Sequence, residues 1–589
     1  MTTAKKHPYA LLGLDIGGVN SRVHLIGIAD GRYQLLGSDL APTSLGQDLH
    51  IGSGVGQAMQ GLQQKADHLF LDENGSLLMP VDRIGRGLDR VGMVLTAVKK
   101  KKTALLGLAG HGSLRAARAL ASSLPLEITA SFDYAQQIDD ERAIERLVGL
   151  LPEIIIIAGG EDQGATEPLH RTIEIVRTAC DLLSPAIRPL IIYAGNTAME
   201  AAARGRLERV ARLRLVPNLQ PVYGQYDLVL AQAHLEREIL RSFQSDFPGS
   251  ESLFALTEKL YGLANCGTER MIRWLSRANA QDEETLVNRG LLAVDLGGTY
   301  TTLTASQNGI SGAVLLDKFP NLTGSERKLA AQAIYDWSDV PVTLEETDQL
   351  LCNYVLAPRT IPDTQHMLSL YLAFARYRLQ RAVKSFAANH GWFDYHAERG
   401  LHGHFEPIIA SGAVLTQTPD PVDVLLTLLD GLQPRQITTL VLDRYHLLPL
   451  LAKFAEVEPL VPVHLLSSSA FENLACVISL TGNLSQKRTA LTVHVKIETG
   501  EKFSKEIHSG GLVRLKIPPG KTAVIELLPH RRVDVGLGGQ GRSGRLKVLG
   551  GLLGVVIDVR GRPLQLHNRP ELRREQLIQW KRMLRFDQE

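Results

Sequence analysis

Two stretches of nearly the same pattern decide the fold of this chain: LLGLDIGGVNSRV at residues 11–23 and LLAVDLGGTYTTL at residues 291–303. Each has an apolar run, an Asp, one apolar residue, two glycines, a short stretch with hydroxyl or amide residues, and further apolar residues. This pattern predicts a β-strand that turns through a glycine hairpin into a second strand. A single turn of this kind is usually only a hairpin, whereas two copies predict two related halves that share a split nucleotide site.

Both turns carry residue types that bind a phosphate and its metal ion. The glycines let backbone N–H groups approach phosphate oxygens, and an Asp carboxylate can hold Mg²⁺ through water. We therefore predict that Asp15 and Asp295 are metal ligands and catalytic residues that position Mg²⁺ and the attacking water. The other candidates for phosphate binding are Gly17, Gly18, Asn20 and Ser21 in the first turn and Gly297, Gly298, Thr299 and Thr301 in the second.

A third candidate element is the segment IIASGAV at residues 408–414. An apolar strand that ends in Ser411 and Gly412 before a helix lets a nucleoside ring pass close to the backbone. Such turns also occur wherever the loop between a strand and a helix is tight. The position of this one after the second hairpin favours a nucleotide-binding role for Ser411 and Gly412.

Composition limits the class of protein. A chain of 589 residues is too long for one core, which predicts roughly three to five domains. Its 44% hydrophobic and 21% charged residues are typical of a soluble globular protein, and a net charge of +2 provides no basic field for nucleic acid. Four widely separated cysteines argue against a disulfide framework, a zinc site or an iron–sulfur cluster. With no visible signal peptide and no apolar run that spans a bilayer, we expect a cytoplasmic protein without membrane contact.

The chain divides into five predicted segments of an α/β fold. Between residues 103 and 222, short apolar runs such as EIIIIAGG (153–160) alternate with amphipathic helical patterns, which predicts an inserted, doubly wound parallel sheet. After residue 484, strand-like runs separated by Gly, Pro and charged turns predict an antiparallel β domain. The segments are a first lobe (1–102), the insert (103–222), a mainly helical segment (223–289), a second lobe (290–482) and a C-terminal β domain with a terminal helix (483–589).

The order of the three candidate elements resembles the ATPase superfamily of actin, heat-shock chaperones and sugar kinases. In that superfamily two phosphate loops and an adenosine loop follow one another, and Asp15–Arg22, Asp295–Thr302 and Ala410–Ala413 match them in this order. The resemblance implies an actin-like, RNase H-like fold of two lobes that binds ATP and Mg²⁺. It also implies that Arg22 faces the phosphates.

Longer phrases are similar to the accessory L component of glutamate mutase over roughly residues 8–480. They include IIIIAGGEDQG (154–164), PLIIYAGNTA (189–198), IIASGAVLTQTPDP (408–421) and TTLVLDRYHLLPLL (438–451). Proteins of this family are actin-like and are encoded beside cobalamin-dependent carbon-skeleton mutases. The resemblance implies an ATPase chaperone whose partner is such a mutase or a related corrinoid protein, which it protects or reactivates.

Three positions depart from the family pattern. Val19 stands where the first loop has a hydroxyl residue, and Arg22 stands where it has a Lys, which binds phosphate differently. In the second loop, Leu303 follows a Thr pair where the family has an acidic residue. These departures concern hydrolysis more than nucleotide binding.

Two further sets of charged residues are candidates. Glu161, or its neighbour Asp162, follows a predicted buried strand, where α/β sheets bind ligands, and is a candidate general base; both acids could instead cap the next helix. Arg560 and Arg562, in the segment DVRGRP, are candidates for partner contact on the ground of charge alone.

Two alternative functions use the same cleft. A small-molecule kinase would phosphorylate a hydroxyl or a carboxylate there. A non-hydrolysing scaffold would keep the fold and bind a protein partner. The sequence leaves the client, the general base and the oligomeric state open.

Overall fold

The computed structural model describes residues 9–44, 51–136, 139–164, 166–222, 224–247, 249–279, 289–318, 324–357, 359–393, 395–396, 400–401, 404–482 and 488–585. The protein forms two compact units. Unit 1 consists of residues 1–96, 252–312 and 316–589, and unit 2 consists of residues 97–251 and 313–315. Each unit has its own hydrophobic core.

The first lobe of unit 1 contains a sheet of β1 (Ala10–Ile16), β2 (Asn20–Ala29), β3 (Arg32–Pro42), β4 (Arg90–Leu95) and β10 (Tyr261–Leu263). The strand order is β10-β4-β1-β2-β3. Strands β1, β2 and β3 pair antiparallel, whereas β4 runs parallel to β1 and β10 runs parallel to β4. The first glycine turn joins β1 to β2, as the sequence predicts.

The second lobe contains an eight-stranded sheet of β11 (Gly290–Leu296), β12 (Tyr300–Gln307), β13 (Ile310–Asp317), β16 (Phe405–Ser411), β17 (Gln436–Asp443), β18 (Phe471–Ser479), β22 (Leu512–Leu515) and β26 (Val555–Asp558). The order is β13-β12-β11-β16-β17-β18-β26-β22, and its first five strands repeat the order of the first lobe. Here too the glycine turn joins an antiparallel pair, β11 and β12, while β16 and β17 continue in parallel. This duplicated topology is the actin-like, RNase H-like fold of two lobes.

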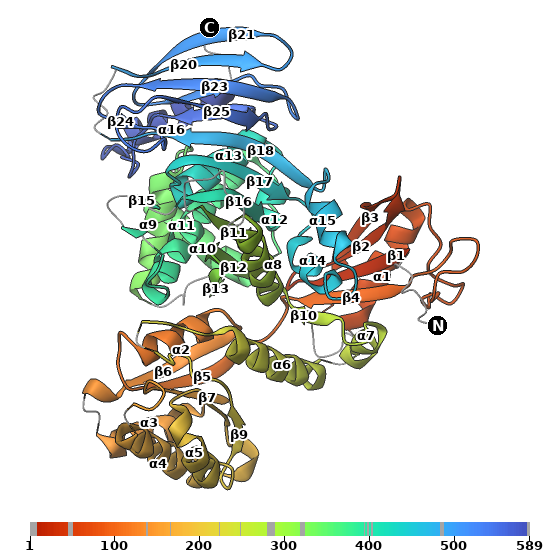
Figure 1. Ribbon diagram of the computed structural model, residues 1–589, viewed down its shortest axis with the longest axis vertical. Helices are drawn as coiled ribbons and strands as arrows, with labels where there is room; N and C mark the ends of the chain where they lie inside the picture. The colour runs from red at the N-terminus through yellow and green to blue at the C-terminus, as the bar shows by residue number, and fades with distance from the viewer. Residues whose placement is uncertain are drawn as a thin grey trace. The chain divides into compact units, whose positions relative to one another are not determined.

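Helices of each lobe cross to the sheet of the other. The helices of unit 1 are α1 (Ile51–Lys65), α8 (Ala264–Asn279), α9 (Ser325–Trp337), α10 (Leu344–Leu356), α11 (Gln365–Asn389), α12 (Ala413–Thr416), α13 (Pro421–Leu432), α14 (Leu448–Phe454), α15 (Leu460–Leu466) and α16 (Pro570–Arg585), with α7 (Ser250–Leu256) at its boundary. Helix α8 follows β10 but packs on β11 and β12, whereas α14 follows β17 but packs on β1 and β4 (Figure 1). Leu11 and Val94 therefore share one buried core with Leu291, Ile409 and Leu450, which fixes the two turns relative to each other.

The C-terminal strands lie partly in the second lobe. Strand β26 pairs parallel with β18, and β22 pairs antiparallel with β26. A separate antiparallel sheet, in the order β21-β20-β23-β25, contains β20 (Thr489–Ile497), β21 (Lys502–His508), β23 (Thr522–Pro529) and β25 (Gly544–Leu549). Apolar residues of this sheet share a core with β18 and β26. The short pairs are β14 (Tyr395–His396) with β15 (Gly400–Leu401) and β19 (Thr481–Gly482) with β24 (Val533–Asp534).

Unit 2 is an all-parallel, five-stranded α/β domain. Its strands are β5 (Lys101–Gly107), β6 (Leu126–Asp133), β7 (Ile154–Ala158), β8 (Leu190–Tyr193) and β9 (Arg212–Leu215), in the order β6-β5-β7-β8-β9. Its helices are α2 (Ser113–Ser122), α3 (Asp140–Leu150), α4 (Glu167–Asp181), α5 (Glu200–Leu207) and α6 (Val229–Asp246), with short 3₁₀ turns at Tyr134–Gln136, Pro185–Ile187 and Thr197–Met199. The strand order reverses between β5 and β7, as in doubly wound sheets, in agreement with the sequence.

Besides the C-terminal strands β22 and β26, which join the sheet of the second lobe, two segments differ from the sequence patterns. The segment expected to be mainly helical contains β10, which is only three residues long and is defined by its pairing with β4. The apolar run VPVHLL at 461–466, whose two valines are typical of a strand, belongs to helix α15.

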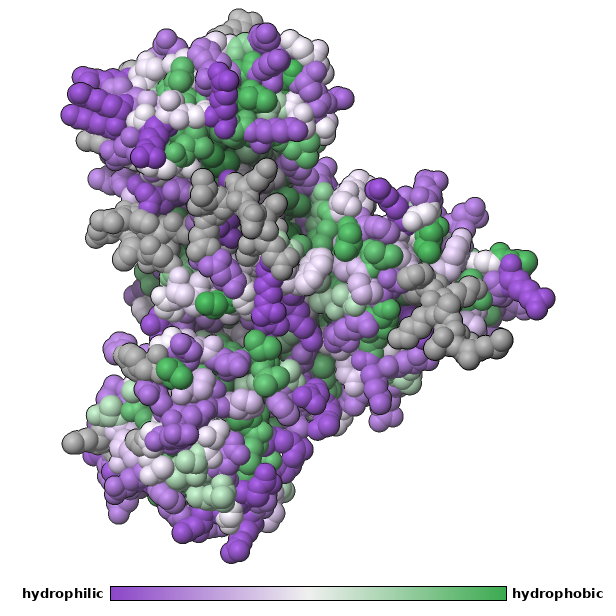
Figure 2. Space-filling view, viewed as in Figure 1, coloured by the Kyte–Doolittle hydropathy of each residue, from purple (hydrophilic) through white to green (hydrophobic). Residues whose placement is uncertain are grey.

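Hydrophilic side chains dominate the face in view in Figure 2, and hydrophobic ones form small separate patches. Among the described residues, no helix has the length and the apolar content needed to cross a membrane.

Candidate nucleotide site

The two glycine turns have the same local geometry. In the first, the N–H of Gly17 donates to the carbonyl of Asn20 at 3.1 Å, and in the second, the N–H of Gly297 donates to the carbonyl of Tyr300 at 3.0 Å. Each turn therefore closes with the same hydrogen bond. The carboxylate of Asp15 and its equivalent, Asp295, lie two residues before these bonds, at the ends of β1 and β11.

The turns are packed directly against each other about a local twofold relation. A Cβ on Gly18 would overlap Oγ1 of Thr299, and a Cβ on the equivalent Gly298 would overlap the side chain of Val19. Neither glycine is in the left-handed region of φ, so close approach rather than backbone conformation requires glycine here. The double glycine thus lets the two lobes meet at the site.

A cavity of about 290 Å³ lies beside the paired turns. Its lining combines acidic groups with the cationic side chains of Arg22, Arg359 and His446. Gly412 also needs to be glycine, because its φ is +96° and a Cβ would overlap Oδ1 of Asp295. The predicted site residues that line the cavity are Asp15, Gly17, Gly18, Asn20, Arg22, Asp295, Gly297, Gly298, Thr299 and Gly412.

Three predicted hydroxyl residues make contacts behind the cavity. Ser21 is hydrogen-bonded to Oγ1 of Thr43 at 2.9 Å, and Ser411 donates to the carbonyl of Asp443 at 3.0 Å. Thr301 accepts a hydrogen bond from Arg378. All three residues are buried and support the loops rather than line the cavity.

The candidate general bases, Glu161 and Asp162, belong to unit 2, whereas the two aspartates belong to unit 1. Glu161 is exposed after β7. Asp162 accepts hydrogen bonds from the N–H of Thr197 at 3.0 Å and from Asn218 at 3.1 Å, and these bonds contribute to a pKa below its ordinary value, against the raising effect of burial. Asp162 therefore joins the loops at the carboxyl end of the parallel sheet.

Sequence reasoning missed His446, which lies between the two aspartates. Its Nδ1 is 2.9 Å from Oδ2 of Asp15, and its Nε2 is 3.6 Å from Oδ2 of Asp295. The N–H groups of Leu447 and Leu448 donate to Asp443 at 2.9 Å each, which anchors the start of α14 beside His446. No spacing rule could have found a pair that is 431 residues apart in the chain.

Asp15 and His446 shift each other's pKa values. Burial acts to raise the pKa of Asp15, but the charges of His446 and Arg22 outweigh it and leave this pKa below its ordinary value. Burial acts to lower the pKa of His446, but Asp15 and Asp295 outweigh it and raise the pKa to about 9. Near neutral pH these shifts favour a protonated imidazole beside the Asp15 carboxylate.

Arg378 and Thr43 hold the two turns from behind. Arg378, which is 2% exposed, donates to the carbonyls of Gly297 and Tyr300 at 2.9 Å each. On the first turn, the hydroxyl of Thr43 donates to the carbonyl of Gly17 at 2.8 Å. These contacts preorganise the turns, and the sequence pattern gave no signal for either residue.

The two aspartates fit a magnesium ion that is held partly through water. Oδ1 of Asp15 is buried and has no hydrogen-bond partner among the described residues, and Asp295 lines the same cavity. Carboxylate oxygens are preferred ligands of Mg²⁺, which usually keeps several waters. Among the described residues, no three His, Cys, Asp or Glu side chains form a metal-binding group, so water would complete the coordination.

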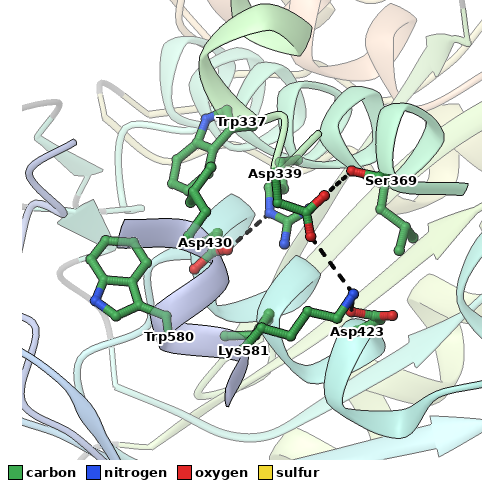
Figure 3. Close-up of a pocket in the computed structure, with 11 residues that line it drawn as sticks. Trp337, Asp339, Ser369, Asp423, Asp430, Trp580 and Lys581 are labelled. Atoms are coloured by element: carbon green, nitrogen blue, oxygen red, sulfur yellow. Dashed lines mark hydrogen bonds and ion pairs between the residues drawn. The ribbon is translucent and has the colours of Figure 1, made fainter. Parts of the chain in front are cut away.

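A second cavity, of about 20 Å³, lies where α16 meets the second lobe (Figure 3). It has room for about one water molecule. Lys581 of α16 pairs with Asp423 at 2.6 Å, and Arg376 pairs with Asp430 at 2.9 Å. The first pair attaches the C-terminal helix and the second joins α11 to α13, so we assign this cavity a structural role.

The prediction that Arg560 and Arg562 contact a partner is wrong. The side chains of both are fully buried. Arg560 pairs with Asp558 and with Asp430 at 2.8 Å each, and Arg562 pairs with Asp558 at 2.8 Å. Buried arginines require such partners, and the pairs leave neither side chain at the surface.

Comparison with known proteins defines the family. The pattern of the MutL protein family matches residues 11–470. The chain belongs to the MutL protein family. This is the family of the glutamate mutase L component, which the sequence phrases resemble, and the match includes both turns and unit 2.

No curated protein matches this chain. Among solved structures, xylulose kinase from Bifidobacterium adolescentis is 11% identical, with 77% of this chain and 94% of that chain covered and a TM-score of 0.24. Porphyromonas gingivalis acetate kinase is 10% identical, with 76% and 100% covered and a TM-score of 0.26. Plasmodium falciparum glycerol kinase with ADP is 7% identical, with 78% and 92% covered and a TM-score of 0.28.

Proposed function

We propose that this protein is an actin-like accessory ATPase that binds Mg·ATP between its two lobes and acts on a client enzyme. The observation that carries the proposal is the convergence of two Asp–Gly–Gly turns on one cavity of about 290 Å³. Small-molecule pockets begin at about 300 Å³, so this volume suits the phosphate end of a nucleotide.

Different residues of the chain would bind the phosphates, hold the metal ion and keep the turns rigid. Arg22 and Arg359 place positive charge in the cavity, which attracts phosphate oxygens. Asp15 and Asp295 would hold Mg²⁺, and the ion when bound would shield the phosphate charge and orient water. Arg378 and Thr43 keep the turns rigid, so that little reorganisation accompanies nucleotide binding.

As the client we propose a cobalamin-dependent carbon-skeleton mutase such as glutamate mutase, or a related corrinoid protein, in the cytoplasm. Membership of the MutL protein family supports this choice. The proposed task is exchange of damaged for intact cofactor, driven by closure of the two lobes on nucleotide. A test is to incubate an inactivated mutase with cobalamin, ATP and this protein and to measure recovered mutase activity. Recovery that needs all three supports the proposal, and recovery without the protein opposes it.

One observation favours a non-hydrolysing scaffold as the second candidate. The turns already touch through Gly18 and Thr299, and Val19 brings a methyl group where the family pattern has a hydroxyl. Such a scaffold would bind nucleotide and client without turnover. By contrast, a small-molecule kinase needs space for an acceptor beside the nucleotide, and a cavity of about 290 Å³ is small for both.

The decisive experiment measures Mg·ATP binding and hydrolysis by the full chain. We expect the wild type to bind Mg·ATP. Asp15→Asn and Asp295→Asn should each weaken binding or turnover at least about tenfold, because each variant removes one negatively charged ligand of the metal ion. Asp30→Asn is the matched control, because Asp30 is exposed in the β2–β3 turn at a positive φ that Asn tolerates. Binding without hydrolysis would favour the non-hydrolysing scaffold. Absence of binding would contradict both the ATPase and the nucleotide-binding scaffold.

A further inference from the structure

The two turns repeat each other, but the residue between their carboxylates has no counterpart. Asp15 and Asp295 are equivalent positions of the repeat, whereas His446 comes only from the second lobe, between β17 and α14. Its two ring nitrogens face one carboxylate each, at 2.9 Å and 3.6 Å. The imidazole thus lies where an ion shared by both aspartates would lie.

We propose that His446 is a positioning residue that holds the two aspartates together in the nucleotide-free cleft and competes with a divalent cation for them. The inference rests on the proposed function only in that it concerns the same pair of carboxylates. It predicts that free metal binds this chain weakly. It also predicts that a metal ion gains Asp15 and Asp295 fully only when His446 gives up its contacts.

The contacts of Asp15 show how the competition works. Its Oδ2 faces His446 at 2.9 Å and Arg22 at 3.7 Å, so this oxygen already has two partners. Its Oδ1 is buried and has none among the described residues. A cation can therefore use Oδ1 alone, whereas a shared site with Asp295 requires displacement of the imidazole.

The backbone on both sides of His446 is anchored. His446 has a φ of +57°, in the left-handed region, and its N–H donates to the carbonyl of Asp443 at 3.4 Å. Asp443 also binds the first N–H groups of α14, so the turn is anchored on both sides of the histidine. The imidazole therefore extends from an anchored turn into the position between the two carboxylates.

The experiment measures Mn²⁺ binding to the nucleotide-free, full-length protein by electron paramagnetic resonance. We use His446→Asn, because Asn tolerates the positive φ and its shorter side chain reaches less far between the carboxylates. His446→Ala is the second variant, and circular dichroism verifies that each variant is folded. We expect Mn²⁺ affinity to rise at least about fivefold in both.

His464→Asn is the matched control. His464, in α15, also joins the lobes, because its Nδ1 accepts the N–H of Tyr33 at 3.1 Å, but it does not line the cavity. Its loss should leave Mn²⁺ affinity unchanged. Unchanged affinity in folded His446 variants, or an equal rise in His464→Asn, would overturn the proposal.

A second readout separates this inference from the function itself. ADP affinity is measured with Mg²⁺ and with a chelator; we expect the ratio of the two affinities to be larger in His446→Asn than in the wild type. If this ratio were the same in both proteins, His446 would not compete with the metal ion for the two aspartates. If neither protein binds ADP, the proposed function fails, while the Mn²⁺ measurement still decides the role of His446.

Discussion

Behind the second turn, two basic side chains are buried together. Lys318 is 2% exposed, and its Nζ lies 5.7 Å from the ring centroid of Tyr354 and 5.5 Å from that of Tyr371. Burial, together with repulsion from Arg378, lowers the pKa of Lys318 to about 7. Tyr371 lines the cavity, so this basic pair is connected to the site by direct contact.

This environment predicts a pH-dependent stability that can be assigned to one residue. Between about pH 7 and the ordinary lysine value of 10.5, the unfolded chain binds a proton that folded Lys318 has released, so the free energy of unfolding rises with pH. The rise is at most about 1.4 kcal/mol per pH unit. We expect Lys318→Met to remove it in denaturant titrations between pH 7 and 9.5, whereas Lys328→Met, at an exposed position, should keep it. Parallel profiles for both variants would contradict the assignment.

At the scale of elements, buried ion pairs attach the C-terminal segment to the second lobe. Arg560 follows β26, pairs with Asp430 of α13, and lies with its Cζ 4.6 Å from the ring centroid of Trp580 in α16. The side chains of Arg560 and Asp558 are fully buried. One arginine thus connects a strand and two helices.

We predict that Arg560→Met destabilises the protein by about 3–5 kcal/mol, because it leaves buried carboxylates short of a partner. Arg545→Met is the control: Arg545 pairs with Glu526 at 3.0 Å on the exposed face of the four-stranded sheet and should cost less than about 1 kcal/mol. Chemical denaturation gives both values, and limited proteolysis of α16 should be faster only in Arg560→Met. If both variants lost a similarly small amount of unfolding free energy, Arg560 would not anchor the C-terminal segment.

At the scale of the whole molecule, unit 2 is an insertion between β4 and β10 of the first lobe. Its core is its own, with Ile155, Ile157, Ile173 and Ile191 at its centre. Lys101, near its start, pairs with Asp246, near its end, at 3.1 Å. The two ends of the insertion are therefore close together, which is the condition for a domain inserted into a loop.

We expect residues 97–251 to fold as an isolated fragment with one cooperative thermal transition, measured by circular dichroism. A chain in which a short Gly/Ser linker replaces these residues should keep the nucleotide affinity of the full chain, since unit 1 contributes every residue that lines the larger cavity. An unfolded fragment would show that its core depends on unit 1. A shortened chain that is folded but has lost affinity would place part of the site in unit 2.

The sequence by itself determined the elements whose signal is local. The repeated Asp–Gly–Gly pattern predicted both hairpins and, from them, two related lobes, because strand alternation and glycine turns need only neighbouring residues. The all-apolar strands of unit 2 predicted its parallel sheet for the same reason. The part of the cavity lining that lies in the two turns, from Asp15 to Gly298, was named in this way.

Only the tertiary structure decided which groups complete the site. His446, Arg378 and Thr43 carry no pattern of their own, and each gains its role when a distant segment packs against a turn. The structure also reassigned residues: Arg560 and Arg562 are charged but buried, because Asp558 and Asp430 lie beside them. Charge and composition predict an exposed residue, whereas burial depends on partners that folding brings from elsewhere in the chain.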